Sequence, residues 1–140
     1  MSAGEVAAAA GIGLAVLALA GLVGILVWLV RRSRRVGEEV RASYVHAVLG
    51  PERGTYRGGT GSYSRVANSG WLVLTDRELV VRTLLGKGFT VQRASIRGTR
   101  VEKSYNGRRS QWPVLVLETS QGEVGLSVAD LPRWQAAIEA

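Results

Sequence analysis

The sequence predicts a single transmembrane α-helix followed by a mainly-β domain of about seven antiparallel strands in a bent sandwich or barrel, closed by a C-terminal α-helix. Three observations predict this fold class: an uncharged apolar run near the N-terminus, alternating apolar and polar residues with turn signals in the second half, and helical spacing at the end. A chain of 140 residues is long enough for one such domain and one additional segment.

The apolar run covers 24 residues, 7–30, and contains no charge and no proline. As a helix it would be roughly 36 Å long, enough to cross a hydrocarbon core of ~30 Å. Trp28 lies near its end, where an indole ring prefers the membrane interface. The small residues of Ala18-Leu19-Ala20 raise the alternative of a cleaved signal peptide. However, no lysine or arginine precedes the run and apolar residues continue beyond Ala20, which favours a retained span.

A basic cluster follows the span at once and consists of Arg31, Arg32, Arg34 and Arg35. Arginine is retained on the cytoplasmic side during insertion, so we expect residues 1–6 outside and the C-terminal part inside the cell. The high ratio of arginine to lysine, with abundant alanine, glycine and valine, favours a GC-rich bacterium as the source, so we expect the span to lie in the inner membrane. An anionic membrane surface would attract each arginine by about 1 kcal/mol.

Small residues within the span are spaced for close packing of helices. Ala7, Gly11 and Ala15 form one row, and Ala20 and Gly24 form another. Such rows allow two helices to approach closely, so a helix-mediated homodimer is one interpretation and a plain lipid-facing anchor is the other.

Residues 31–50 are predicted to form a basic juxtamembrane segment and linker, which Gly50-Pro51 would end. The domain would then cover 51–140. The apolar residues of segment 37–49 fit a short amphipathic helix, and an opening strand is equally compatible. His46 has no second metal ligand nearby in the sequence. The apolar residues whose spacing fits a short helix in segment 37–49 are Val40, Tyr44, Val45 and Val48.

Within the domain, alternation and turn residues predict strands at 54–60, 71–75, 78–85, 89–92, 96–104, 112–119 and 124–128. In the third of these, Leu79 and Val81 would lie on one face, and Val80 and Arg82 on the other. Residues 105–112 are expected to form an exposed loop. The run from Val114 to Leu117 is wholly apolar, which indicates a central strand.

The chain ends in a predicted helix. Asp130 is a good N-cap, and Pro132 is tolerated in the first turn. Leu131, Trp134 and Ile138 fall on one apolar stripe, which should face the core.

Short motifs support a family resemblance over residues 54–140. The stretch LTDRELVV at 74–81 is similar to a turn between early strands of pleckstrin-homology-like (PH-like) domains, and Trp134 matches the helix tryptophan that caps their barrel. The stretch TYRGGT at 55–60 is similar to the opening strand of small actinobacterial membrane proteins with one such domain. The chain therefore resembles bacterial PH-like (GRAM-like) proteins with one transmembrane helix. The resemblance implies two bent antiparallel sheets and a binding or scaffold role.

The resemblance also implies that basic residues in loops could contact an anion or a partner. Family members that bind phosphoinositides place them between the first two strands, where this chain offers two arginines without the usual lysine-rich pattern. Two further cations would lie at another rim, and the 105–112 loop combines arginine with aromatic residues, as protein contact sites do. The candidate contacts to an anion or partner are Arg57, Arg65, Arg82, Lys87, Arg108, Arg109 and Trp112.

The sequence lacks the residues that several kinds of catalysis and ligand binding require. There is no cysteine and one histidine, and no glycine-rich loop precedes a Lys-Ser or Lys-Thr pair. The acidic residues fall at outward strand positions or in turns, like solubilising charges. The net charge of +7 is not arranged as the dense basic stripe typical of nucleic-acid binding. We therefore expect no enzyme activity, cofactor, metal or nucleic-acid partner.

The sequence thus predicts a non-enzymatic membrane protein that presents a cytoplasmic PH-like domain. It would act as an adaptor or accessory subunit for another membrane protein. The alternative is a module that senses anionic lipid at the inner leaflet.

Overall fold

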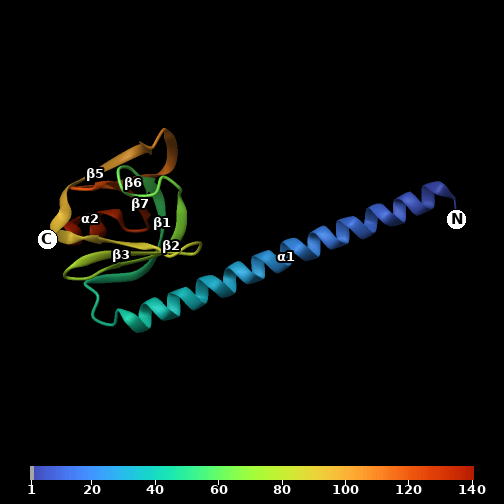
Figure 1. The fold of residues 1–140 in the computed structure, drawn as a ribbon, viewed down its shortest axis with the longest axis horizontal. Helices are drawn as coiled ribbons and strands as arrows, with labels where there is room; N and C mark the ends of the chain where they lie inside the picture. The colour runs from blue at the N-terminus through green and yellow to red at the C-terminus, as the bar shows by residue number, and fades with distance from the viewer. Residues whose placement is uncertain (1) are drawn as a thin grey trace. The chain divides into compact units, whose positions relative to one another are not determined.

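The computed structural model describes residues 2–140 and contains one long helix, a curled seven-stranded antiparallel sheet and a short C-terminal helix (Figure 1). This confirms the predicted fold class. The chain divides into two compact units, one ending at Arg34 and the other covering Arg35–Ala140. The boundary falls within the long helix, α1 (Ala3–Ser43).

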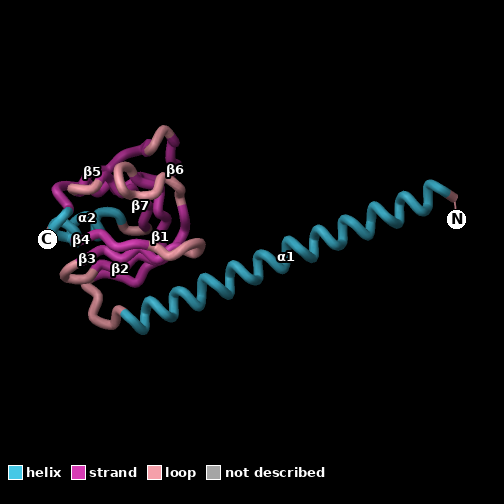
Figure 2. Tube along the Cα trace, viewed as in Figure 1, coloured by secondary structure: helices cyan, strands magenta, loops and turns pink. Residues whose placement is uncertain are grey.

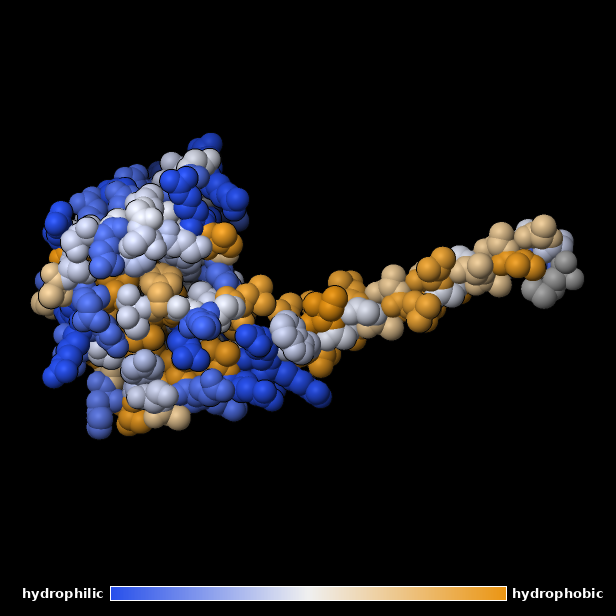
Figure 3. Space-filling model, viewed as in Figure 1, coloured by the Kyte–Doolittle hydropathy of each residue, from blue (hydrophilic) through white to orange (hydrophobic). Residues whose placement is uncertain are grey.

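The first unit consists of the apolar part of α1. Its side chains are exposed from Ala3 to Trp28, and Figure 3 shows apolar residues along this stretch. A helix satisfies every backbone hydrogen bond within one segment, as a lipid environment requires. Among the residues described, α1 is the one helix long and apolar enough to cross a membrane. The guanidinium carbon of Arg32 lies 5.4 Å from the ring centroid of Trp28.

The second unit begins with the C-terminal part of α1, which continues without a break to Ser43. The predicted linker is therefore largely helical, and the helical interpretation of segment 37–49 is correct as far as Ser43. A turn then leads into the sheet, and it leaves Val45 and Val48 exposed, not on an apolar helix face. The helix ends at Ser43, and strand pairing begins six residues later, where Leu49 lies opposite Leu74.

The sheet order is β4-β3-β2-β1-β7-β6-β5, and every neighbouring pair is antiparallel. Figure 2 shows these strands in magenta, curled around α2. A 3-10 turn, Arg93–Ser95, connects the two edge strands. The seven predicted strands are all present, although their ends differ by several residues. The elements are β1 (Leu49–Gly59), β2 (Asn68–Leu74), β3 (Glu78–Thr83), β4 (Phe89–Gln92), β5 (Ile96–Tyr105), β6 (Arg108–Thr119), β7 (Gly122–Val128) and α2 (Leu131–Glu139).

Strand β1 starts earlier than the sequence suggested. Gly50-Pro51 was expected to end the preceding segment, but it lies inside β1 at an irregularity in the register between Leu49 and Glu52. Gly50 has a φ of 85°, which favours glycine, and a Cβ there would lie 2.5 Å from the Leu72 carbonyl oxygen. A glycine thus lets this strand pass an irregularity that would otherwise break the pairing.

The main core fills the inner face of the curled sheet. Leu79 and Val81 point into it, as their alternation predicted, together with Leu115 and Leu117 from β6. Helix α2 closes the core with the fully buried Trp134.

Two hydrogen bonds fix the position of this helix. Asp130 caps it by accepting a hydrogen bond from the Arg133 backbone at 3.2 Å. The indole of Trp134 donates to Glu52 at 2.9 Å, so the one polar atom of the side chain is satisfied. This bond ties α2 to β1, which confirms the predicted capping helix.

A second apolar cluster lies on the outer face, under the C-terminal end of α1. Val40 packs there against Trp71, Val73 and Val80, so Val80 is buried although it points away from the main core. Gly37 is required for this contact, because a Cβ at Gly37 would lie 2.5 Å from Cζ2 of Trp71.

Substitution of Gly37 tests how much this contact stabilises the domain. We expect Gly37→Leu to lower the free energy of unfolding by about 1–3 kcal/mol, because the new side chain overlaps the indole ring of Trp71. The measurement is urea unfolding of the full chain in detergent, followed by tryptophan fluorescence. Ala42→Leu, at an exposed position of the same helix, is the matched control. Equal stability of the two variants would contradict the prediction.

Candidate functional site

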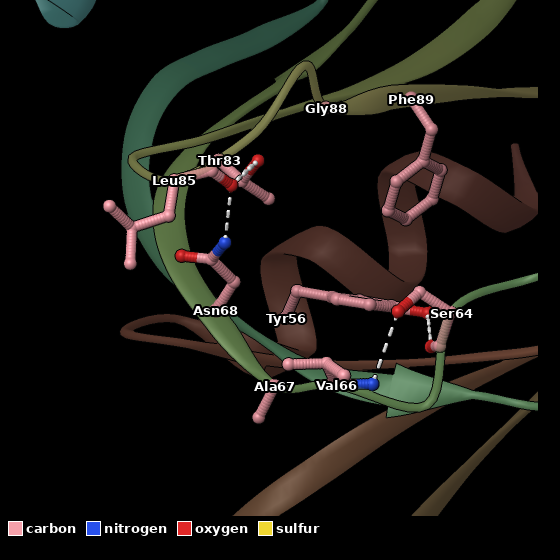
Figure 4. Close-up of a pocket in the computed structure, with 9 residues that line it drawn as sticks. All are labelled: Tyr56, Ser64, Val66, Ala67, Asn68, Thr83, Leu85, Gly88 and Phe89. Carbon is pink, nitrogen blue, oxygen red and sulfur yellow. Dashed lines mark hydrogen bonds between the residues drawn. The ribbon is translucent and has the colours of Figure 1, made fainter.

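A pocket of about 410 Å³ opens at the end of the domain where the β1–β2 loop approaches the β3–β4 turn (Figure 4). Its volume lies within the range of small-ligand sites. Neither an acidic nor a basic side chain is among its lining residues. These are Tyr56, Ser64, Val66, Ala67, Asn68, Thr83, Leu85, Gly88 and Phe89.

Two aromatic rings form the inner wall of the pocket. The ring centroids of Tyr56 and Phe89 are 4.9 Å apart, in an edge-on arrangement that aromatic pairs favour. The Tyr56 hydroxyl donates a hydrogen bond to the carbonyl of Ser64, which joins β1 to its following loop. Burial raises the pKa of Tyr56 to about 12, so the phenol is neutral at physiological pH. The wall is therefore uncharged and apolar.

The polar groups at the rim are engaged within the domain. The Asn68 amide donates to the Leu85 carbonyl at 2.6 Å, and the Thr83 hydroxyl donates to the same oxygen at 2.9 Å. The first bond fixes β2 against the β3–β4 turn, and the second holds the turn to the end of β3. Two apolar side chains stand exposed beside them, Val66 at 72% and Leu85 at 57% of their surface. Such a rim suits an uncharged apolar group, since an anion would lose hydration without a compensating cation.

The structure does not gather the predicted basic residues into one site. Arg57 lies on the outer face of β1 and donates to Ser110 at 3.0 Å. Arg82 lies on the outer face of β3, 3.7 Å from Glu39 of α1. Arg65 and Lys87 are exposed in the loops beside the pocket, but neither lines it.

The predicted exposed loop at 105–112 is largely strand, which corrects the sequence interpretation. Strands β5 and β6 continue to a two-residue turn, Asn106-Gly107, and Tyr105 is buried. The two turn residues have φ angles of 52° and 73°, as a type I′ hairpin requires. The sequence signal for this tight hairpin was the Asn-Gly pair.

The distal part of this hairpin, residues 103–112, folds back across the outer face of β7 and β1. The register shifts between Glu102, opposite Val114, and Ser104, opposite Arg109. The Tyr105 ring then lies on β7, where a Cβ at Gly125 would be 2.6 Å from Cδ1 of the ring.

Two hydrogen bonds hold the tip of the hairpin in this position. The Asn106 amide donates to the Gly59 carbonyl at 3.2 Å, and the Arg57 guanidinium donates to the Ser110 hydroxyl. The tip is thus fixed to β1, two strands away from β6 in the sheet order.

An ion-pair cluster lies beside the hairpin, and the sequence did not predict it, because its carboxylates were interpreted as solubilising charges. The guanidinium of Arg100 contacts Glu102 at 3.1 Å, Glu118 at 2.7 Å and Glu123 at 2.9 Å. These hydrogen bonds, chiefly that to Glu123, raise the pKa of Arg100 further above its ordinary value. Cross-strand pairing brings together four residues that are up to 23 positions apart, so no local pattern signalled the cluster.

The basic cluster at the end of the apolar helix is exposed. Arg31, Arg32 and Arg34 belong to the first unit and Arg35 to the second. No group of three or more His, Cys, Asp or Glu side chains able to hold a metal ion occurs among residues 2–140.

Comparison with known proteins yields no match, either among protein-family models or among curated proteins.

Substitution of Tyr105 tests the burial of the hairpin. Burial, then the charge of Glu123, raise the pKa of Tyr105 from 10.0 to about 12, so the folded state holds the phenol proton more tightly than the unfolded state. This contribution to stability is complete below pH 10 and is lost as the pH rises toward 12. Tyr105→Phe should therefore flatten the decline of stability above pH 10.

The Tyr105 hydroxyl is buried without a hydrogen-bond partner, so its removal in Tyr105→Phe should leave stability at neutral pH unchanged or slightly higher. Urea unfolding at a series of pH values measures both effects. A Tyr105→Phe curve parallel to that of the unsubstituted chain throughout the alkaline range would show that the prediction is wrong.

Proposed function

We propose that this chain is a single-pass protein of the bacterial inner membrane that presents a PH-like binding domain in the cytoplasm. It acts without catalysis, as an adaptor or accessory subunit for another membrane protein. The uncharged pocket supports a binding role most directly, because it has the volume of a ligand site and its described lining contains no carboxylate, histidine or lysine.

The ligand of this pocket is an apolar segment of a partner protein. The Tyr56 and Phe89 rings supply an apolar wall, and exposed Val66 and Leu85 extend it to the surface. An apolar side chain inserted between them would bury these two residues. A tether within a few nanometres of the partner raises the effective concentration to the mM range, so a small interface is sufficient.

Anionic-lipid sensing at the inner leaflet remains the second candidate function. Its predicted contacts Arg57 and Arg82 are engaged with Ser110 and Glu39 on the outer face of the sheet, whereas Arg65 and Lys87 flank a pocket without charge. The arrangement therefore favours a protein segment as the ligand of the pocket.

Membrane orientation is tested by thiol labelling, for which the absence of cysteine in the chain is an advantage. A maleimide that does not cross membranes should label Ser2→Cys in intact spheroplasts, because residues 1–6 lie outside. Ala136→Cys, exposed on α2, should react only after the membrane is opened. Labelling of Ala136→Cys in intact spheroplasts would contradict the cytoplasmic location.

Partner binding is tested by photo-crosslinking from position 67 in intact membranes. We expect one dominant crosslinked species, and Val66→Glu should reduce it at least tenfold, a loss of about 1.4 kcal/mol, because a carboxylate would have to be desolvated in the apolar rim. Val45→Glu is the matched control, since Val45 is exposed to 74% and lies outside the pocket. Equal crosslinking by both variants would exclude the pocket as the binding site.

A further inference from the structure

The distal hairpin, residues 103–112, concentrates exposed cations at one end of the β5–β6 pair. It contains Lys103, Arg108 and Arg109 and no acidic residue. All three are exposed, and none forms an ion pair within residues 2–140. By contrast, Arg82 and Arg100 on the sheet surface are paired with glutamates. The hairpin therefore carries three positive charges of its own, beside a cluster whose three glutamates are already paired with Arg100.

An exposed indole accompanies these cations. Trp112 has 69% of its surface exposed, whereas Trp71 and Trp134, the other tryptophans of the second unit, are buried. It lies in the part of β6 between Arg109 and Val114, where the regular pairing with β5 is interrupted. The pocket is lined by other residues, so the indole is not part of that site.

The hairpin is held in place before any ligand binds. Tyr105 is buried on Gly125, Asn106 is bonded to Gly59, and Ser110 is bonded to Arg57. A surface that is already ordered loses little conformational entropy on binding. Its aromatic and basic groups are thus presented as a fixed unit.

We propose that the distal hairpin is a contact site for the surface of an anionic phospholipid bilayer. The indole of Trp112 would lie in the interface, where tryptophan is favoured, and Arg108 and Arg109 would bind lipid phosphates. A protein partner would have to supply a pocket for a projecting indole, whereas a bilayer interface accepts it without one. The candidate span also keeps a bilayer within reach of the domain. This site is separate from the pocket and does not require a partner protein.

The test follows one thiol in the full chain, reconstituted into vesicles of phosphatidylcholine alone or with added phosphatidylglycerol. Gln111→Cys places a unique thiol at an exposed position of the hairpin. A water-soluble maleimide should modify it at least about fivefold more slowly in the anionic vesicles, the factor that one arginine contributes near such a surface. Ala136→Cys, exposed on α2, should react at the same rate in both vesicles.

Charge and aromatic variants identify the groups responsible. Adding Arg108→Gln and Arg109→Gln to Gln111→Cys should abolish the slowing, and Trp112→Ser should weaken it with all charges retained. The matched control, Arg65→Gln with Lys87→Gln, removes the same charge beside the pocket and should leave the slowing intact. These side chains are exposed, so we expect each variant to fold, which circular dichroism checks.

Two results would overturn the proposal. One is an equal rate for Gln111→Cys in both kinds of vesicle. The other is slowing by soluble polyglutamate in neutral vesicles without slowing by phosphatidylglycerol, which would assign the hairpin to an acidic polypeptide. Neither result bears on crosslinking from the pocket, so failure of this proposal and failure of the adaptor function are distinguishable.

Discussion

The central strands carry apolar side chains on both faces, and the structure depends on covering both. Leu115 and Leu117 of β6 point into the main core, while Val114 and Val116 point to the outer face, and all four are fully buried. At about 25 cal/mol per Å² of apolar surface, leaving either face in water would cost several kcal/mol. Each surface segment that packs on this sheet can be understood as a cover for one of its faces.

Three different segments supply these covers. Helix α2 closes the inner face with Trp134. The end of α1 covers β2 and β3 through Gly37 and Val40. The distal hairpin covers β7 by laying Tyr105 on Gly125. Glycine recurs where a ring or helix must approach the backbone closely, because any larger residue would overlap it.

The covers also determine which surfaces stay available for binding. The folded-back hairpin buries its tyrosine but leaves its tryptophan and arginines in solvent, so one feature of the chain produces both a buried cluster and the proposed contact surface. At the end of the sheet, the Tyr56–Phe89 pair lines the pocket, and the bond from Asn68 to Leu85 holds two parts of the pocket wall together. The proposed partner site and the proposed lipid site thus arise from separate features of one sheet.

The sequence alone determined the apolar helix, the seven strands and the closing helix, because each depends on local periodicity, capping and turn residues. It also identified Trp112 and its neighbouring arginines as a contact surface, a function that stays a prediction. Only the tertiary structure decided that Tyr105 is buried, that Arg100 gathers three glutamates and that Gly37 meets Trp71. These contacts join residues distant in the sequence, and the curl of the sheet and the register of its strands, which no local pattern encodes, bring them together.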